Sequence, residues 1–308
     1  MDPFNQPAPP VRLVGWPQVA LLVTTSTAIA LSLGGMLEET GAIIALLSAA
    51  LLVIGMPHGS FDIALLQHRA PPGASPHSRV LLIALYLACA MAMYALWRVA
   101  PAWGLGVFLL MAGVHFAEDW RSCGSGFIAL GIALALLSAP ALLHAASLRG
   151  YFAILSNDAA ARNLVDLLLL IAPVMLALAA VGVAMLWRAR EHRLAIAAGC
   201  GVTAMLVLPP VHGFALFFCL VHSPIQFGDH ARALGQRGLC QWGGTVIPLT
   251  LGGLGMAVAI FILNRGAVIT QDVFAASFVA LSVLTAPHML VPVMVRLSVR
   301  WGLGQRPS

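Results

Sequence analysis

Four of the ten histidines lie inside long apolar stretches of the chain, where an ionisable side chain is costly. His58 stands in GMPHGSFD, His115 in AGVHFAEDW, His222 in CLVHSPIQ and His288 in TAPHML. Ionisable residues within membrane segments usually face the bundle interior or a water-filled cavity. Neutral imidazole is the commonest side-chain ligand for metals such as iron, zinc and copper. The four histidines therefore predict a metal site inside a membrane protein.

Two carboxylates follow histidines of this set at the same spacing. Asp62 lies four residues after His58, and Asp119 lies four residues after His115. Residues four apart share one face of an α-helix. We expect each carboxylate to accept a hydrogen bond from an imidazole of the metal site and to fix its tautomer, as is common around bound metals. The alternative is an ordinary carboxylate at a helix end on the membrane surface.

The composition indicates which elements must position these residues. Of 308 residues, 60% are hydrophobic and only 9% are charged, whereas soluble domains average about 25% charged residues. This excludes a soluble enzyme and a disordered protein. The 16 basic residues are all arginines and lie scattered, with no basic stripe. A nucleic-acid partner is therefore excluded as well.

We expect an all-α, multi-pass membrane bundle that forms a single transmembrane domain over residues 1–308. A short segment, 1–16, precedes the first helix, and a short tail, 297–308, follows the last. A membrane helix needs roughly 20 apolar residues, and about ten stretches qualify. Pro209 and Pro210 divide the seventh stretch from the eighth, and the longest loop is expected over 145–163. The expected spans are 17–35, 41–66, 80–97, 102–120, 126–144, 164–187, 194–208, 210–227, 243–263 and 273–295.

The arginines predict how these spans are oriented. With ten spans both termini lie on one face, which receives twelve arginines, and four fall on the other. Cytoplasmic loops carry an excess of basic residues, so both termini are expected in the cytoplasm, with the chain in a bacterial cytoplasmic (inner) membrane. The larger set is Arg12, Arg69, Arg79, Arg121, Arg188, Arg190, Arg193, Arg232, Arg237, Arg296, Arg300 and Arg306, and the smaller is Arg98, Arg149, Arg162 and Arg265. The four histidines of the metal site then lie at a similar depth.

The motifs resemble those of the Brp/Blh family of integral-membrane β-carotene 15,15'-dioxygenases. The resemblance lies in PHGSFD at 57–62, HFAEDW at 115–120 and the pair His222-Ser223, supported by PHML near the C-terminus and by the order of the apolar spans. It implies a non-haem Fe(2+) held by four histidines. It also implies that β-carotene and O2 are the substrates, and that cleavage of the central double bond gives two molecules of all-trans retinal.

By this resemblance His58, His115 and His222 are metal ligands, and no catalytic residue beyond the metal ligands is implied. The fourth ligand does not transfer, because the family has H-S-x-x-H and Gln226 stands where the second histidine is expected. Either Gln226 binds through its amide oxygen, or His288 completes the shell, or the metal site is degraded. His230 is a poorer candidate, since it lies two turns, roughly 12 Å, beyond His222 along a helix.

Three functions are compatible with these residues. The first is iron-dependent cleavage of β-carotene in membrane lipid, with a rhodopsin as the recipient of the retinal. The second, favoured by Gln226, is a catalytically weak or silent carotenoid- or retinal-binding membrane protein. The third is a metal transporter that uses the same histidines. Iron is expected from the resemblance, while imidazoles alone also suit zinc or copper.

Overall fold

Helices make up all the regular structure that is described. The computed structural model describes residues 15–62, 65, 76–235 and 239–300. These ranges contain no strand, which confirms the predicted all-α class. Residues 1–14 and 301–308, which belong to the predicted terminal segments, lie outside the described residues.

Eight of the described helical stretches are long and apolar enough to cross a membrane, and two further apolar helices are shorter. Together they coincide with the ten predicted spans, which confirms a multi-pass membrane bundle. The eight are Gly41–Phe61, Val80–Val99, Pro101–Cys123, Gly126–Leu155, Asp158–Arg188, Pro210–Ala233, Val246–Leu263 and Ile269–Val291, and the shorter two are Gln18–Leu33 and His192–Val207.

The predicted loop over 145–163 is wrong. Helix α6 spans Gly126–Leu155 and α7 spans Asp158–Arg188, so only a short turn separates them. The helix α6 bends at His144, whose backbone angles (φ −129°, ψ 32°) are not helical. Beyond the bend an apolar face continues, because the helix buries Leu148, Phe152 and Leu155.

The predicted break at the two prolines is confirmed. Helix α8 (His192–Val207) ends just before Leu208, whose backbone is extended (φ −78°, ψ 154°), and α9 (Pro210–Phe217) begins at the second proline. Proline fixes its own φ and disfavours helical geometry in the residue before it. The two prolines therefore start a new helix.

Contacts divide the chain into two compact units, each assembled from separated segments. Unit 1 contains Met1–Glu39, Gly113–Ala153 and Asp158–Ile225, and unit 2 contains Thr40–Ala112, Ile154–Asn157 and Gln226–Ser308. Helices α5 (Pro101–Phe116) and α10 (Ser223–Ala233) each begin in one unit and end in the other. The single domain over 1–308 stays a prediction.

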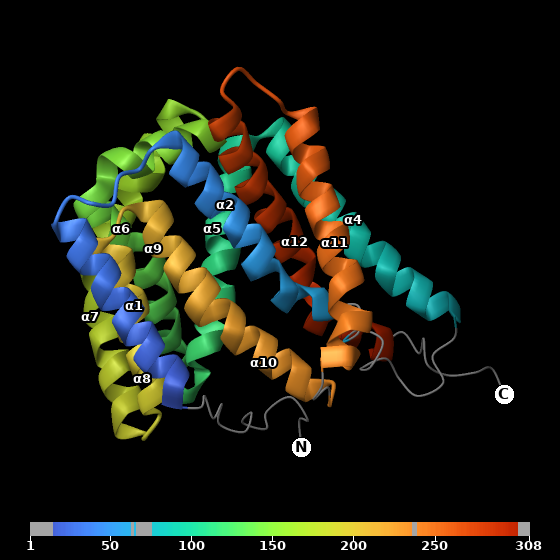
Figure 1. Cartoon of the computed structure of the whole chain (residues 1–308). Coiled ribbons are helices and arrows are strands. Elements are labelled where there is room, and N and C mark those ends of the chain that lie inside the picture. The colour runs from blue at the N-terminus through green and yellow to red at the C-terminus, as the bar shows by residue number, and fades with distance from the viewer. Residues whose placement is uncertain (1–14, 63–64, 66–75, 236–238, 301–308) are drawn as a thin grey trace. The chain divides into compact units, whose positions relative to one another are not determined.

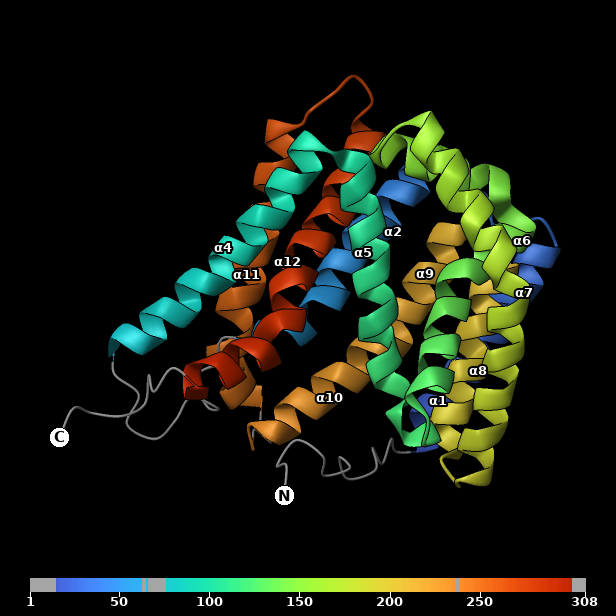
Figure 2. The ribbon, with the colours of Figure 1, turned by 180° about the vertical axis from the view of Figure 1, so that it is seen from behind.

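In unit 1, helix α8 packs against α1 (Gly15–Leu33), α7 and α9, and Figure 2 shows α8 beside α7. Small residues allow this approach. A Cβ atom on Gly213 of α9 would lie 2.9 Å from the carbonyl oxygen of Ala204 in α8. The backbones of α8 and α9 are therefore closely apposed.

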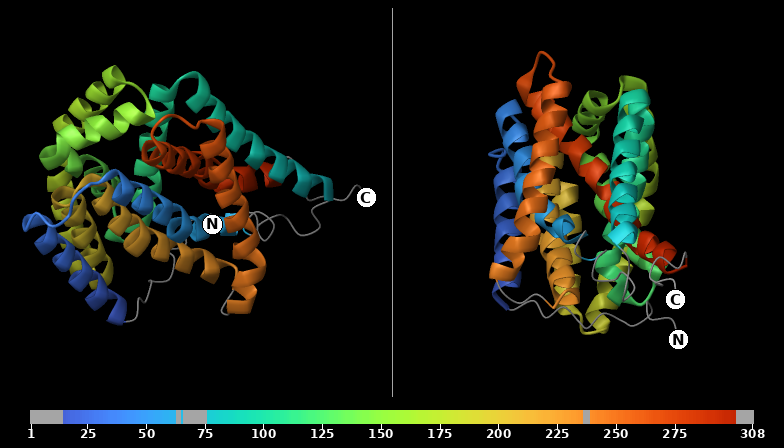
Figure 3. Two further views of the ribbon diagram at one scale, coloured as in Figure 1. Left: turned by 45° about the horizontal axis from the view of Figure 1, so that its top comes forward. Right: turned by 90° about the vertical axis from the view of Figure 1, so that its right-hand side faces the viewer.

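In unit 2, helix α12 (Ile269–Arg300) packs against α2 (Gly41–Gly55), α4 (Pro76–Val99) and α11 (Leu239–Leu263). Figure 1 labels these helices, and Figure 3 shows α12, in red, between α11 and α4. The indole Nε1 of Trp97 in α4 donates a hydrogen bond to Oγ of Ser282 in α12, at 2.5 Å.

Candidate functional site

The three sequence motifs lie where the helix type changes. A 3-10 helix, η1 (Met56–Phe61), contains the PHG motif, and a second, η2 (Ala117–Cys123), follows His115. A π-helix, η3 (Phe218–His222), ends at the third motif. A 3-10 helix has three residues per turn, so residues four apart no longer share a face, and π-helical turns often occur at functional sites. These changes determine which way the motif side chains point.

In unit 1, His222 and Asp119 form a completely buried hydrogen-bonded pair. Nδ1 of His222 lies 2.8 Å from Oδ2 of Asp119, and neither side chain is exposed. A buried carboxylate needs a hydrogen-bond donor to offset its lost hydration, so Nδ1 carries the proton and donates it. Nε2 then holds the lone pair, the form in which an imidazole binds a metal.

The second predicted ligand of unit 1 lies against the first. The ring centroids of His115 and His222 are 4.7 Å apart, and the ring planes are nearly perpendicular, at 84°. Nδ1 of His115 lies 3.6 Å from Oε2 of Glu118, and Glu118 accepts a hydrogen bond from Arg121 at 2.6 Å. The structure thus brings together His115, His222 and Asp119.

Aromatic side chains surround the His222 ring. The centroid of Phe116 lies 4.7 Å from that of His222, and the centroid of Phe218 lies 5.3 Å from it in a stacked arrangement. The centroid of Phe217, a fully buried residue, lies 6.1 Å from that of His222. This apolar wall excludes water from the imidazole, which strengthens electrostatic interactions there.

In unit 2, a second buried aspartate binds a second histidine. Oδ1 of Asp62 lies 2.6 Å from Nδ1 of His288, and Oδ2 accepts a hydrogen bond of 2.9 Å from the hydroxyl of Tyr86. The Asp62 side chain is 2% exposed and that of His288 is 10% exposed. The carboxylate therefore uses both oxygens, and it connects the end of η1 with α4 and α12.

The structure gives less detail about the other candidate residues. His58 lies in η1 in unit 2, and its side chain falls outside the described ones. Gln226 is buried in α10. The ring of His230, also in α10, lies 5.6 Å from that of His288 and 6.2 Å from that of Phe61. Among the described side chains, no three His, Cys, Asp or Glu residues form a group that could hold a metal ion.

Comparison with known proteins decides the family. A family model described as beta-carotene 15,15'-dioxygenase matches residues 49–295. The chain belongs to the β-carotene 15,15'-dioxygenase family. A curated relative, the beta-carotene 15,15'-dioxygenase of uncultured marine bacterium 66A03, is 24% identical over 256 residues, which are 79% of this chain and 90% of the relative. No solved structure matches the chain.

Membership of the β-carotene 15,15'-dioxygenase family confirms the resemblance predicted from the motifs, and with it the assignment to a family of enzymes. The matched residues include every candidate site residue, from His58 to His288. Sequence reasoning missed Tyr86. The sequence does contain an indication of its role. The chain has only 3 tyrosines, and a tyrosine hydroxyl in an apolar helix usually finds a hydrogen-bond partner.

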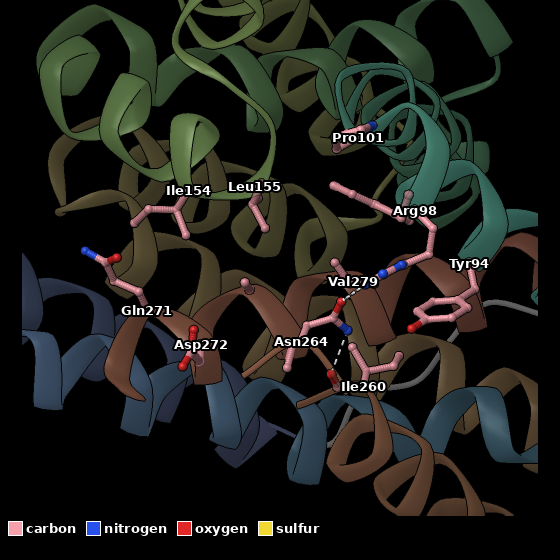
Figure 4. Close-up of a pocket in the computed structure, with 13 residues that line it drawn as sticks. Tyr94, Arg98, Pro101, Ile154, Leu155, Ile260, Asn264, Gln271, Asp272 and Val279 are labelled. Carbon is pink, nitrogen blue, oxygen red and sulfur yellow. Dashed lines mark hydrogen bonds between the residues drawn. The ribbon is translucent and has the colours of Figure 1, made fainter. Parts of the chain in front are cut away.

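This β-carotene 15,15'-dioxygenase family member also has a cavity of about 350 Å³ within unit 2 (Figure 4). Its walls come from α4, α11, α12, the start of α5 and residues 154–155. Arg98 donates a hydrogen bond to the side chain of Asn264, which donates to the carbonyl oxygen of Ile260 at 2.7 Å. None of the candidate metal ligands lines this cavity, so it is a separate feature of the unit.

Proposed function

We propose that this protein cleaves the central 15,15' double bond of β-carotene with O2 and yields two molecules of all-trans retinal. The name of the curated relative, of which the chain covers 90%, supports this activity. The structural observation that carries the proposal is the buried cluster of His115, His222 and Asp119. Ionisable residues within a membrane protein are costly and usually functional.

The donor set of this cluster suits a borderline metal ion. Two adjacent imidazoles, one with Nδ1 bound to a carboxylate, are typical of sites for iron, zinc or copper. We assign His58, His115 and His222 as ligands of Fe(2+). The motif resemblance supports all three, and the 4.7 Å between ring centroids supports the pair in unit 1. When bound, the iron supplies the activation of O2.

The remaining position of the metal shell has two candidates. Gln226, one helical turn after His222, offers a neutral amide oxygen. His288 offers an imidazole whose Nδ1 is bound to Asp62. Asp119 binds Nδ1 of His222, and Asp62 binds Nδ1 of His288.

The protein's other residues bind and shield the substrate. β-Carotene is an apolar rod that dissolves in membrane lipid, so no transfer to water is required before it binds. Phe116, Phe217 and Phe218 keep the surroundings of His222 apolar. Apolar walls of this kind are usual for sites that take hydrophobic ligands. Addition of O2 across a double bond requires no acid–base pair from the chain.

We place the protein in a bacterial cytoplasmic membrane with both termini in the cytoplasm. Arg188, Arg190 and Arg193 flank the turn between α7 and α8, as expected for a cytoplasmic loop. Retinal released into the lipid is then available to a rhodopsin in the same membrane.

Expression in cells that accumulate β-carotene tests this function. We expect loss of the carotenoid colour and appearance of retinal by chromatography. His222→Ala abolishes both, because it removes a ligand and the hydrogen bond that His222 makes with the buried Asp119. His192→Ala is the matched control, since this histidine is exposed at the start of α8. Absence of bleaching in iron-replete cells, or bleaching that survives His222→Ala, would refute the proposal.

Gln226 supports a second candidate, a membrane protein that binds a carotenoid or retinal without cleaving it. A neutral amide is a weaker ligand than an imidazole for borderline metals. In that case the purified protein retains β-carotene with a shifted absorption spectrum and forms no retinal. A metal transporter, the third candidate from the sequence, instead predicts metal uptake into proteoliposomes.

A further inference from the structure

The cavity of about 350 Å³ in unit 2 lies at one end of the membrane spans. Its walls come from the places where Val80–Val99 ends and Pro101–Cys123 begins, and where Val246–Leu263 ends and Ile269–Val291 begins. The ends of membrane spans lie where the hydrocarbon of the bilayer meets the lipid headgroups. The cavity is therefore at the depth of the headgroups.

The apolar walls of the cavity are fixed by close packing. The ring of Trp97 is buried, and a Cβ atom on Gly104 would lie 2.8 Å from its Cδ2 atom, so the indole lies tightly against α5. The indole nitrogen donates a hydrogen bond of 2.5 Å to Ser282 in α12. Leu155 and Ile260 are buried as well. These walls are preformed, as they are in most ligand sites.

Arg98 places a positive charge beside these walls. It donates a hydrogen bond to the side-chain oxygen of Asn264, and the amide nitrogen of Asn264 donates to the carbonyl oxygen of Ile260 at 2.7 Å. Among the described residues, no carboxylate forms an ion pair with Arg98. A guanidinium has several N–H donors, and the bond to Asn264 uses one of them. Arg98 therefore retains donors for an anionic group.

Asp272 places a negative charge in the same cavity. One of its oxygens, Oδ2, accepts a hydrogen bond of 2.8 Å from the backbone nitrogen of Gly266. A carboxylate can accept several hydrogen bonds, so this bond leaves acceptor positions. Figure 4 shows Asn264 between Arg98 and Asp272. A simple anion would be repelled by Asp272, whereas a group that carries both charges matches both residues.

We propose that this cavity binds the headgroup of phosphatidylethanolamine, with the phosphate at Arg98 and the ammonium at Asp272. Arginine binds phosphate through charge-assisted hydrogen bonds, and a primary ammonium donates to a carboxylate. The volume is near the lower end of the range for ligand pockets, roughly 300–1,000 Å³. It accommodates a headgroup, while the acyl chains remain in the bilayer. This site does not depend on carotenoid cleavage.

Lipid titration followed by native mass spectrometry tests this site. The full-length protein is purified in detergent, freed of lipid and titrated with phosphatidylethanolamine or with phosphatidylglycerol, which has the phosphate but no ammonium. We expect one phosphatidylethanolamine to bind per chain, roughly tenfold more tightly than phosphatidylglycerol, the size expected for one charge-assisted hydrogen bond. Equal affinity for the two lipids would overturn the proposal.

Arg98→Gln tests the phosphate contact. We expect it to weaken the binding of both lipids roughly tenfold, because both carry the phosphate. Arg265→Gln is the matched control. Arg265 is exposed in the turn before α12 and does not line the cavity, so this variant removes the same charge and leaves binding unchanged. Equal binding by the two variants would contradict a phosphate site at Arg98.

Asp272→Asn tests the ammonium contact. The asparagine oxygen still accepts from Gly266, but the negative charge is lost. We expect the preference for phosphatidylethanolamine to disappear while phosphatidylglycerol still binds. A misfolded variant loses both lipids equally, so the preference separates recognition from folding. If the preference persists, or if both lipids are lost equally, the carboxylate does not recognise the headgroup and the proposal is overturned.

Two competitors identify the source of the ligand. Glycerophosphoethanolamine has the same headgroup without acyl chains, and retinal has neither charge. We expect neither to displace phosphatidylethanolamine at equal concentration. Displacement by glycerophosphoethanolamine would show that the cavity binds a water-soluble phosphoester, and displacement by retinal would show that it belongs to the carotenoid reaction. Either result would overturn the lipid assignment.

Discussion

At the scale of single residues, Gln226 and His288 are the two candidates for the fourth position of the proposed metal shell. Gln226 is 6% exposed and offers a neutral amide oxygen, whereas Nδ1 of His288 is bound to a buried carboxylate. If His288 supplies the fourth imidazole, a histidine introduced at 226 has nothing to add. It becomes useful only when His288 is lost.

This difference can be measured in two backgrounds. We expect Gln226→His alone to leave iron content and retinal formation nearly unchanged, His288→Asn to lower both roughly tenfold or more, and the double variant to recover much of the loss. Iron per protein is measured by elemental analysis and retinal by chromatography. Gln271→His, at the separate cavity, is the control in both backgrounds. A large gain from Gln226→His alone would instead identify position 226 as the ligand site.

The residue types of the site could be predicted from sequence, but their partners could not. Histidines in apolar stretches and aspartates four residues later stand out without a structure. Which imidazole each aspartate binds depends on the 3-10 geometry of η1 and η2 and on helices far away in the sequence. Tyr86 shares no local pattern with Asp62, because they lie on different elements.

At the scale of elements, the close packing of α9 against α8 determines the position of His222. Helix α9 continues directly into η3, which ends at His222. Gly213 leaves room for the α8 backbone, since a Cβ there would lie 2.9 Å from the carbonyl oxygen of Ala204 and 3.2 Å from Cα of Met205. Backbone atoms cannot give way as a flexible side chain can.

Gly213→Ala should therefore separate α9 from α8. Overpacking typically costs about 1–3 kcal/mol, and we expect a lower thermal unfolding temperature together with reduced iron content. Gly199→Ala in α8 is the matched control, because nothing lies within 4 Å of its Cβ position. Equal unfolding temperatures for the two variants would show that the close approach does not limit stability.

The spans could be predicted because a bilayer requires long apolar helices, and hydropathy alone reveals them. Their ends could not. The sequence analysis predicted a loop over 145–163, yet α6 bends at His144 and continues with a buried apolar face. Arg149 forms an ion pair of 2.8 Å with Asp166 of α7. An ion pair between two helices cannot be recognised from the residues next to Arg149 in the sequence.

At the scale of the whole molecule, the predicted orientation depends on helix α8. With 16 residues it is roughly 24 Å long, shorter than the roughly 30 Å of hydrocarbon in a typical bilayer. If α8 and the helices after Pro210 are separate crossings, three spans separate the turn after α7 from the turn after α11. The two turns then lie on opposite faces of the membrane.

Single cysteines in a chain whose 5 cysteines have been replaced test this topology. Ala189 and Ala267 are exposed in these two turns, and replacing them leaves every arginine in place. We expect a membrane-impermeant maleimide to label Ala267→Cys in intact cells, and to label Ala189→Cys only after permeabilisation, because the arginines beside Ala189 keep its turn in the cytoplasm. Labelling of both from outside would show that α8 does not cross the membrane separately. Labelling of Ala189→Cys alone would show that the whole chain is inverted.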